Sequence, residues 1–151
     1  MSTRAIIRFA AREEGVTFSE HPEVDKILTQ IYHHYDGYPE YLGVELAEFL
    51  SDYRVVNGLG VEKYRDDGSK IANGLGCLAA QVVAELKGVP GNVYLQKPSK
   101  EKGWEDYIYY IWGVENKSIW FSIFDYDDNC IFVGEPHKLI EKYKQNTNDD
   151  G

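Results

Sequence analysis

EDYIYYIWG (residues 105–113) and SIWFSIFDY (118–126) indicate the fold class, because both segments combine aromatic and β-branched residues as strands do. Glu115-Asn116-Lys117 separates them as a turn, and CIFVG (130–134) follows a second turn at Asp127-Asp128-Asn129. The three segments predict an antiparallel meander. An aromatic content of 14%, including 12 Tyr, is typical of an aromatic-lined sheet.

The first third of the chain predicts two further strands. Residues 3–9 alternate between two sides, with Ile7 and Phe9 on the opposite side from Arg8. Residues 27–35 are rich in β-formers and stop at the turn dipeptide Asp36-Gly37, so we expect the two segments to pair antiparallel. A short strand is expected at 92–96, after Pro90-Gly91.

Two main helices are expected between these strands. The first covers about 39–52, with Pro39 in its first turn and apolar residues at helical spacing. The second covers about 74–87, where one apolar stripe runs alongside a stripe of small residues, so burial on most sides is expected. The apolar stripe consists of Leu75, Ala79, Val82 and Leu86, and the small stripe of Cys77, Ala80 and Ala84. Residues 53–72 are interpreted as the main irregular loop.

The elements together predict one α+β domain over residues 1–145, with an antiparallel sheet of about five to six strands, two main helices and a short C-terminal helix from Pro136. Residues 146–151 are expected to be a frayed polar tail. Aromatic strands that lack a covering helix on every face also predict a homodimer.

The net charge of −9 argues against a protein that binds duplex nucleic acid, because neutralising phosphates needs a basic face. The two cysteines, Cys77 and Cys130, have neither CxxC nor His partners at metal-ligand spacing, so no metal site is expected. The alternate spacing of Asp125, Asp127 and Asn129 lacks the later residues of a calcium loop and is interpreted as a hairpin turn. Short apolar runs with internal arginines predict neither a signal peptide nor a membrane span, hence a cytoplasmic protein.

A cluster of chemically versatile side chains lies around the Asp36-Gly37 turn. Imidazoles, phenols and a carboxylate here, together with strand arginines and a glycine-rich helix start, form the candidate ligand-binding set. The set is Arg4, Arg8, His33, His34, Asp36, Tyr38, Asn73 and Gly74. The competing interpretation is structural: strand alternation separates the two histidines, Asp36 caps a turn and the glycines serve turns.

Cys77 carries the alternative, enzymatic hypothesis. A thiol in the first turn of a helix has its pKa lowered by the helix dipole, and His34 as base with Asp36 as orienting residue would complete a cysteine-dependent hydrolase or transferase. The opposing interpretation places Cys77 as a small buried residue beside Ala80 and Ala84, where the thiol is inert. We favour the second interpretation, so no catalytic residue and no cofactor is expected.

Several strings resemble a group of small uncharacterised proteins of phages and prophage-bearing bacteria. They are MSTRA (1–5), HYDGYP (34–39), LAEFL (46–50), NGLGCLAAQ (73–81) and GNVYL (91–95), and the resemblance covers most of residues 1–95. It implies a phage-type inhibitor or sequestering protein, since such proteins often disable host defences such as CRISPR effectors or nucleotide signals. The expected partner is therefore a host defence protein or a small nucleotide, bound without catalysis.

Overall fold

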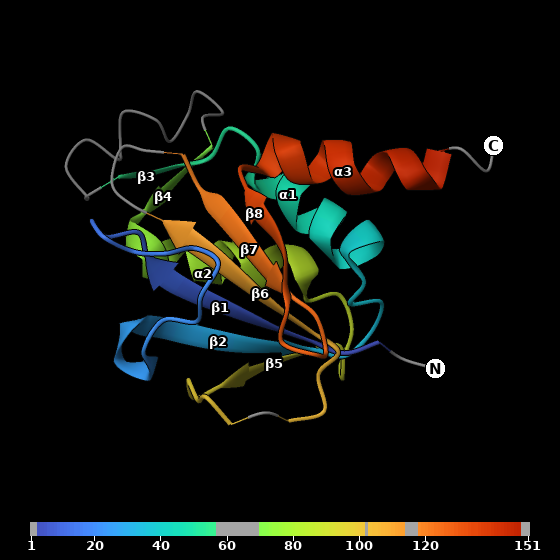
Figure 1. Ribbon diagram of the computed structural model, residues 1–151, viewed down its shortest axis with the longest axis horizontal. Coiled ribbons are helices and arrows are strands. Elements are labelled where there is room, and N and C mark those ends of the chain that lie inside the picture. Colours follow the sequence, from blue (N-terminus) through green and yellow to red (C-terminus); the bar gives the residue numbers. More distant parts are fainter. Residues whose placement is uncertain (1–2, 57–69, 102, 114–117, 149–151) are drawn as a thin grey trace.

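The computed structural model describes residues 3–56, 70–101, 103–113 and 118–148. These residues form a six-stranded sheet in the order β5-β2-β1-β6-β7-β8 and a two-stranded sheet, β3-β4 (Figure 1). The strands are β1 (Ala5–Ala11), β2 (Ile27–His33), β3 (Arg54–Val56), β4 (Ile71–Asn73), β5 (Val93–Gln96), β6 (Tyr107–Gly113), β7 (Trp120–Phe124) and β8 (Cys130–Gly134). The helices are the 3-10 helix η1 (Val24–Lys26), the π-helix η2 (Pro39–Gly43), α1 (Val44–Leu50), α2 (Gly74–Leu86) and α3 (Pro136–Asn148).

The predicted α+β class with a mostly antiparallel sheet is confirmed. Strand β1 pairs antiparallel with β2, and β6, β7 and β8 form the expected meander. The sequence did not predict that β1 also pairs with β6, in parallel, from Ala5 opposite Tyr107 to Ala11 opposite Gly113. This pair joins the two halves of the chain into one sheet.

The three α-helices cover one face of the six-stranded sheet. Ala5, Ile7 and Phe9 of β1 point toward them and belong to the larger hydrophobic core. Helix α2 packs against β1 and β2, while α1 and α3 pack against each other, with α3 over β7 and β8. Within the described residues, no helix is both long and apolar enough to cross a membrane.

Residues 12–26, which join β1 to β2, cross the opposite face of the sheet (Figure 1). The Phe18 ring stacks on Trp120 with centroids 5.1 Å apart and meets Trp112 edge-on at 5.3 Å. Ser122 Oγ donates to the Phe18 carbonyl oxygen at 2.5 Å and accepts from Trp112 Nε1 at 2.8 Å. Aromatic residues of β6 and β7 are thus covered by residues 12–26 of the same chain. This coverage removes the main reason for expecting a homodimer, and the homodimer stays an untested prediction.

The packing of α2 corrects one expectation. The apolar stripe packs on the sheet as predicted, with Ala79, Val82 and Leu86 buried, but the small stripe of Cys77, Ala80 and Ala84 is exposed. The helix is therefore buried on one face only, because no second layer lies over α2 among the described residues.

Two segment assignments also change. The irregular loop expected over 53–72 begins and ends with a strand, because β3 and β4 pair in parallel. Residues 57–69, between these strands, lie outside the described residues. The turn expected at 115–117 also lies outside them. Helix α3 continues to Asn148, into the tail that was expected to fray, and residues 149–151 are not described.

Candidate functional site

A large hollow lies between the η2–α1 segment and the C-terminal end of α2, with a volume of about 840 Å³. Its lining includes five carboxylates and no Lys or Arg side chain. The carboxylates are Asp36, Glu40, Glu45, Glu48 and Glu85, and the apolar part of the wall includes Tyr35, Tyr41, Phe49 and Val89. We call this hollow the acidic groove.

A tight turn at Asp36-Gly37 shapes one end of the acidic groove. Asp36 has a φ of 51°, a left-handed conformation that Asp tolerates better than most residues. A Cβ on Gly37 would lie 2.9 Å from the Ala5 Cβ, so only glycine fits against β1. The buried Tyr109 hydroxyl donates to the Gly37 carbonyl oxygen at 2.7 Å and holds the turn in place. The chain then enters the π-helix η2, a wide turn that is frequent at functional sites.

Among the described residues, one of the five carboxylates in the groove has a cationic partner. Glu48 forms an ion pair with Lys144 at 2.8 Å, whereas Asp36, Glu40, Glu45 and Glu85 form none with the described residues. Burial, followed by the negative charge of Glu85, raises the pKa of Glu45. The groove therefore holds negative charge that the protein leaves uncompensated.

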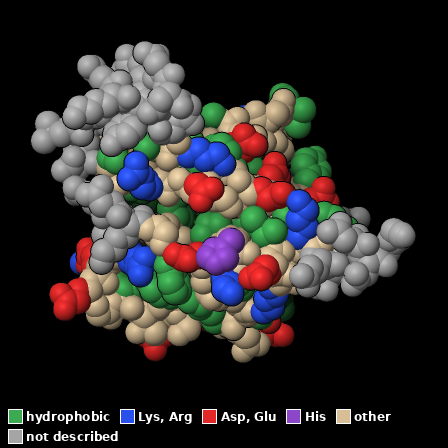
Figure 2. All heavy atoms as spheres, turned by 90° about the horizontal axis from the view of Figure 1, so that it is seen from above, with side chains coloured by type: hydrophobic (Ala, Val, Ile, Leu, Met, Phe, Trp, Pro, Cys, Tyr) green, Lys and Arg blue, Asp and Glu red, His purple; other side chains and the backbone are tan. Residues whose placement is uncertain are grey.

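This concentration of one charge contrasts with the face over α1 and α3. Figure 2 shows basic and acidic side chains interspersed on that face, with hydrophobic side chains between them. Lys138 pairs with Glu141 at 3.4 Å, and the Glu48–Lys144 pair joins α1 to α3. Charge on α3 is thus largely balanced locally, unlike in the groove.

Two polar atoms in the wall of the groove are buried without a hydrogen-bond partner. They are His33 Nδ1 and Asn92 Oδ1. His33 is only 8% exposed. Burial, the largest effect, lowers the pKa of His33, and its neighbour His34 lowers it further, while the Tyr35 backbone and Asp36 act in the opposite direction. Buried polar atoms are normally paired, so these two atoms are exceptions among the described residues.

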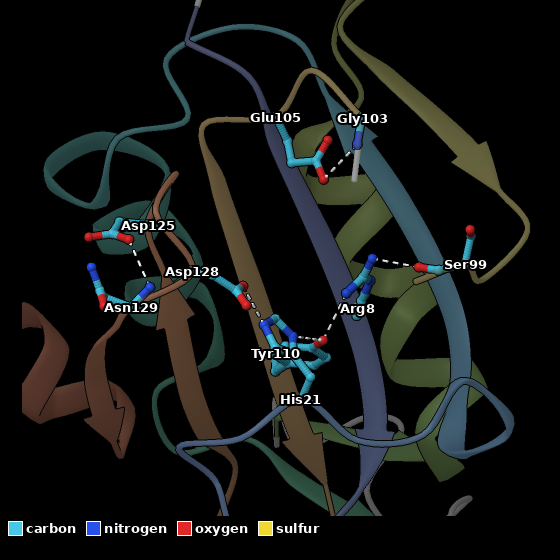
Figure 3. Close-up of polar contacts among 9 residues, drawn as sticks. All are labelled: Arg8, His21, Ser99, Gly103, Glu105, Tyr110, Asp125, Asp128 and Asn129. Atoms are coloured by element: carbon cyan, nitrogen blue, oxygen red, sulfur yellow. Dashed lines mark hydrogen bonds and ion pairs between the residues drawn. The ribbon is translucent and has the colours of Figure 1, made fainter. Parts of the chain in front are cut away.

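A second polar cluster lies on the other face of the sheet, beneath residues 12–26 and 97–105 (Figure 3). Arg8 at its centre is 3% exposed. Its Nε donates to Gln30 Oε1 at 2.8 Å, its Nη1 to the Tyr110 hydroxyl at 2.8 Å and its Nη2 to the Ser99 carbonyl oxygen at 2.6 Å. Each nitrogen of the guanidinium thus has a partner within the protein.

Tyr110 extends this cluster to the surface (Figure 3). Its hydroxyl lies 2.6 Å from His21 Nδ1, and His21 Nε2 lies 2.6 Å from Asp128 Oδ1. Burial raises the pKa of Tyr110, although Arg8 opposes the shift, so the phenol keeps its proton at neutral pH and can donate to His21. This series of hydrogen bonds, from Arg8 through Tyr110 and His21 to Asp128, holds residues 12–26 against the sheet. We interpret it as structural.

The turn that carries Asp128 is a hairpin turn, as expected from the sequence. Asp125 Oδ1 accepts from the Asn129 backbone N–H at 2.9 Å, and Asp128 has a φ of 66° (Figure 3). No group of three or more His, Cys, Asp or Glu side chains among the described residues could hold a metal ion.

The predicted ligand-binding residues do not form one site. His33 and Asp36 line the acidic groove, but Arg8 lies on the opposite face, where each of its guanidinium nitrogens donates to a partner within the protein. Arg4 lies over the Trp104 ring at 5.7 Å, on the Arg8 side of the sheet. His34 Nδ1 is hydrogen-bonded to the Tyr32 hydroxyl at 2.8 Å. Period-2 alternation separated the two histidines, as expected.

Asn73, Gly74 and Tyr38 lie outside the groove as well. Asn92 Nδ2 donates to the Leu86 carbonyl oxygen at 2.8 Å, so the C-terminal end of α2 lies at the groove. Asn73 and Gly74 are at the other end of this 13-residue helix, roughly 18 Å away. Tyr38 lines a separate hollow of about 290 Å³ with Asp106 and Asp125.

The structure contradicts the expected burial of Cys77 and does not bring Cys77 together with His34 and Asp36. Cys77 is exposed, which contradicts its expected burial, and its Sγ lies 3.9 Å from Gln81 Oε1. The His34 backbone N–H donates to the Asn92 carbonyl oxygen at 2.9 Å, beside the last turn of α2, whereas Cys77 lies in the first turn. Roughly 13 Å of helix separates the two regions, so Cys77, His34 and Asp36 do not form a catalytic triad.

The sequence analysis missed Asn92, Glu45 and Glu85. Asn92 was assigned only to the short strand expected at 92–96. An available signal was the excess of acidic residues in 36–48 without a single Lys or Arg. Comparison of the chain with protein-family models, curated proteins and solved structures found no match.

Proposed function

We propose that this protein is a non-catalytic inhibitor or sequestering protein that binds a basic segment of another protein in the acidic groove. The observation that supports this proposal is the uncompensated charge: four carboxylates of the groove have no cationic partner among the described residues. Attraction between such a groove and a basic segment accelerates association and selects partners by charge. Exposed Tyr35 and Tyr41 at the groove add aromatic contact surface of the kind enriched in interfaces.

The resemblance to phage proteins supports a partner that belongs to a host defence system, met in the host cytoplasm. Many defence effectors bind nucleic acid and therefore carry basic surfaces. An acidic groove fits such a surface. The phage context and the identity of the partner rest on this resemblance alone.

Sequestration of a small nucleotide is the weaker alternative. Phosphate needs available cationic or N–H donors, yet Arg8 is 3% exposed, with each guanidinium nitrogen bonded within the protein, and the lining of the groove contains no Lys or Arg among the described residues. The acidic groove would repel a phosphate. Mass spectrometry of small molecules that copurify with the protein tests this alternative directly.

The main experiment is capture of partners from host lysate on immobilised protein, at low and at high salt. The wild type should retain a basic protein at low salt and release it as salt rises. The double variant Glu45→Lys and Glu85→Lys should lose that partner. Glu23→Lys is the matched control, because Glu23 is an exposed carboxylate outside the groove that pairs with Lys100. If Glu23→Lys loses the partner as completely, or the wild type captures no basic protein, the proposal fails.

A further inference from the structure

A hollow on the face of the sheet opposite the acidic groove contains a buried carboxylate. Its volume is about 330 Å³, and strands β1 and β2 form one wall while residues between 96 and 105 form the other. We call it the Glu105 hollow, because Glu105 lines it with only 4% of its surface exposed. Carboxylates are rarely buried without partners, so the contacts of Glu105 indicate what the hollow can bind.

Glu105 has one carboxylate oxygen without a partner. Oε1 accepts from the Gly103 backbone N–H at 3.2 Å (Figure 3), and no Lys or Arg among the described residues forms an ion pair with Glu105. Oε2 has no hydrogen-bond partner in the same part of the chain, yet, unlike His33 Nδ1 and Asn92 Oδ1, it is not closed off from solvent. A Cβ on Gly103 would lie 2.9 Å from Oε2, so glycine keeps the space beside this oxygen open. Oε2 is therefore available to a hydrogen-bond donor that enters the hollow.

The charges that line the Glu105 hollow balance one another. Arg8 and Lys97 are opposed by Glu101 and Glu105, whereas the lining of the acidic groove contains no Lys or Arg. An anion would meet the two carboxylates, and a cation would meet the guanidinium and the ammonium. The hollow therefore suits an uncharged ligand that supplies N–H donors to Oε2. A phosphorylated ligand is further disfavoured by the net charge of −9.

Aromatic and amide side chains of the lining favour a planar ligand. The rings of Tyr32 and Trp104 line the hollow, and Trp104 is 80% exposed, so its ring is available for stacking. Gln30 Nε2 donates to Gln96 Oε1 at 2.8 Å, which orients the Gln96 amide and leaves its Nε2 as a donor. A planar heterocycle with both N–H donors and ring acceptors would use the carboxylate, the rings and the amide together.

We infer that the Glu105 hollow binds an uncharged guanine ring, such as that of guanosine. Guanine presents two adjacent N–H donors, N1–H and N2–H, which match the two oxygens of one carboxylate. Adenine, cytosine and uracil each place an acceptor beside their N–H donor, and that acceptor would face Glu105. Oε1 keeps a lone pair for the ligand besides the one that Gly103 uses. This inference is independent of the proposed function, since it concerns the other face of the sheet.

Calorimetric titration of the full chain with guanosine, inosine and adenosine tests the inference. Inosine lacks the 2-amino group of guanosine and thus one of the two donors. Guanosine should bind about tenfold or more tightly than inosine, because hydrogen bonds to a charged group are the strong ones. Adenosine should show no measurable binding. Equal affinities for guanosine and inosine, or no binding of guanosine, would overturn the inference.

The variant Glu105→Gln should reduce the preference for guanosine over inosine to about one, because its amide turns N–H donors toward the donors of the ring. Glu20→Gln is the matched control, since Glu20 is an exposed carboxylate outside the hollow, and it should keep the full preference. An unchanged preference in Glu105→Gln would overturn the role of this carboxylate. If Glu105→Gln does not fold, the comparison of guanosine with inosine on the wild type still decides the inference.

Stacking has its own variant. Trp104→Ala should weaken the binding of guanosine and of inosine by the same factor, about fivefold or more, because both rings stack alike. Unchanged affinities would overturn the contact with this ring.

A single-stranded oligonucleotide with one guanine among adenines identifies the source of the ring. The net charge of −9 repels its phosphates, so the oligonucleotide should bind more weakly than guanosine at low salt. Tighter binding of the oligonucleotide would overturn the uncharged ligand and assign the hollow to a nucleic-acid strand.

Discussion

The Arg8 cluster and the acidic groove lie on opposite faces of the same sheet, and they differ in whether their polar groups have partners within the protein. Around Arg8, a buried cation is paired with Gln30, Tyr110 and Ser99, so each nitrogen of the guanidinium has a partner. In the groove, buried acceptors and several carboxylates have none among the described residues. A buried charge with hydrogen-bond partners stabilises the fold, whereas exposed carboxylates without cationic partners contribute little to stability and keep their charge available for a binding partner.

The two clusters should therefore respond to substitution in opposite ways. Changes in the Arg8 cluster should reduce the free energy of unfolding and leave ligand binding by the folded protein intact. Changes in the groove should alter binding with little loss of stability. The predictions below test this contrast from the largest expected effect to the smallest.

Arg8→Met should cause the largest loss, about 3 kcal/mol or more of the free energy of unfolding, because it leaves Gln30 and Tyr110 without their buried partner. Urea denaturation measures this loss. Arg12→Met is the control: Arg12 lies over the Phe18 and Trp120 rings and should cost about 1 kcal/mol or less. Equal losses in the two variants would mean that the Arg8 cluster has no special structural role.

Tyr110→Phe should cost about 1 to 3 kcal/mol, because both Arg8 Nη1 and His21 Nδ1 lose their partner. The loss should concentrate in residues 12–26, which His21 fastens to the sheet. Limited proteolysis should then cut this segment faster than in the control Tyr94→Phe, where the side chain is 49% exposed. An unchanged cleavage rate would mean that the Tyr110–His21 hydrogen bond does not hold residues 12–26 against the sheet.

His33 should make stability depend on pH. Burial lowers the pKa of His33 in the folded state, whereas the pKa of the imidazole in the unfolded chain is about 6.5. The unfolded state therefore binds more protons as the pH falls below about 6.5, and stability decreases toward acidic pH. His33→Phe should flatten this decrease in urea denaturation, and the exposed His137→Phe should not. An unchanged slope in His33→Phe would show that His33 is not held neutral by burial.

Glu45→Gln should have the smallest effect on stability and should raise it, by up to about 0.5 kcal/mol at neutral pH. The pKa of Glu45 is raised, chiefly by burial, so its ionised form is disfavoured in the folded state and stability is lost as the pH rises through that pKa. The same variant should weaken the retention of a basic protein from host lysate at low salt. A variant that is less stable, or that binds as tightly, would contradict the assignment of Glu45 to a binding groove.

The sequence by itself determined the elements, because their signals are local. Period-2 alternation in 3–9 and the aromatic segments after residue 105 predict strands, and Asp36-Gly37 predicts the turn that the structure contains. The same alternation correctly separated His33 from His34. Helix spacing likewise predicted the buried stripe of α2.

Only the tertiary structure decided which elements meet. The parallel pairing of β1 with β6 joins residues about a hundred positions apart, and no local pattern specifies such a contact. The exposure of Cys77 depends on whether a second layer covers α2, which its own sequence does not encode. The groove brings His33 together with Glu85 and Asn92 because β5 returns beside β2 after α2. Most helices and strands follow from short-range conformational preferences, so the sequence predicted them. The groove follows from long-range packing, so the sequence missed most of its residues.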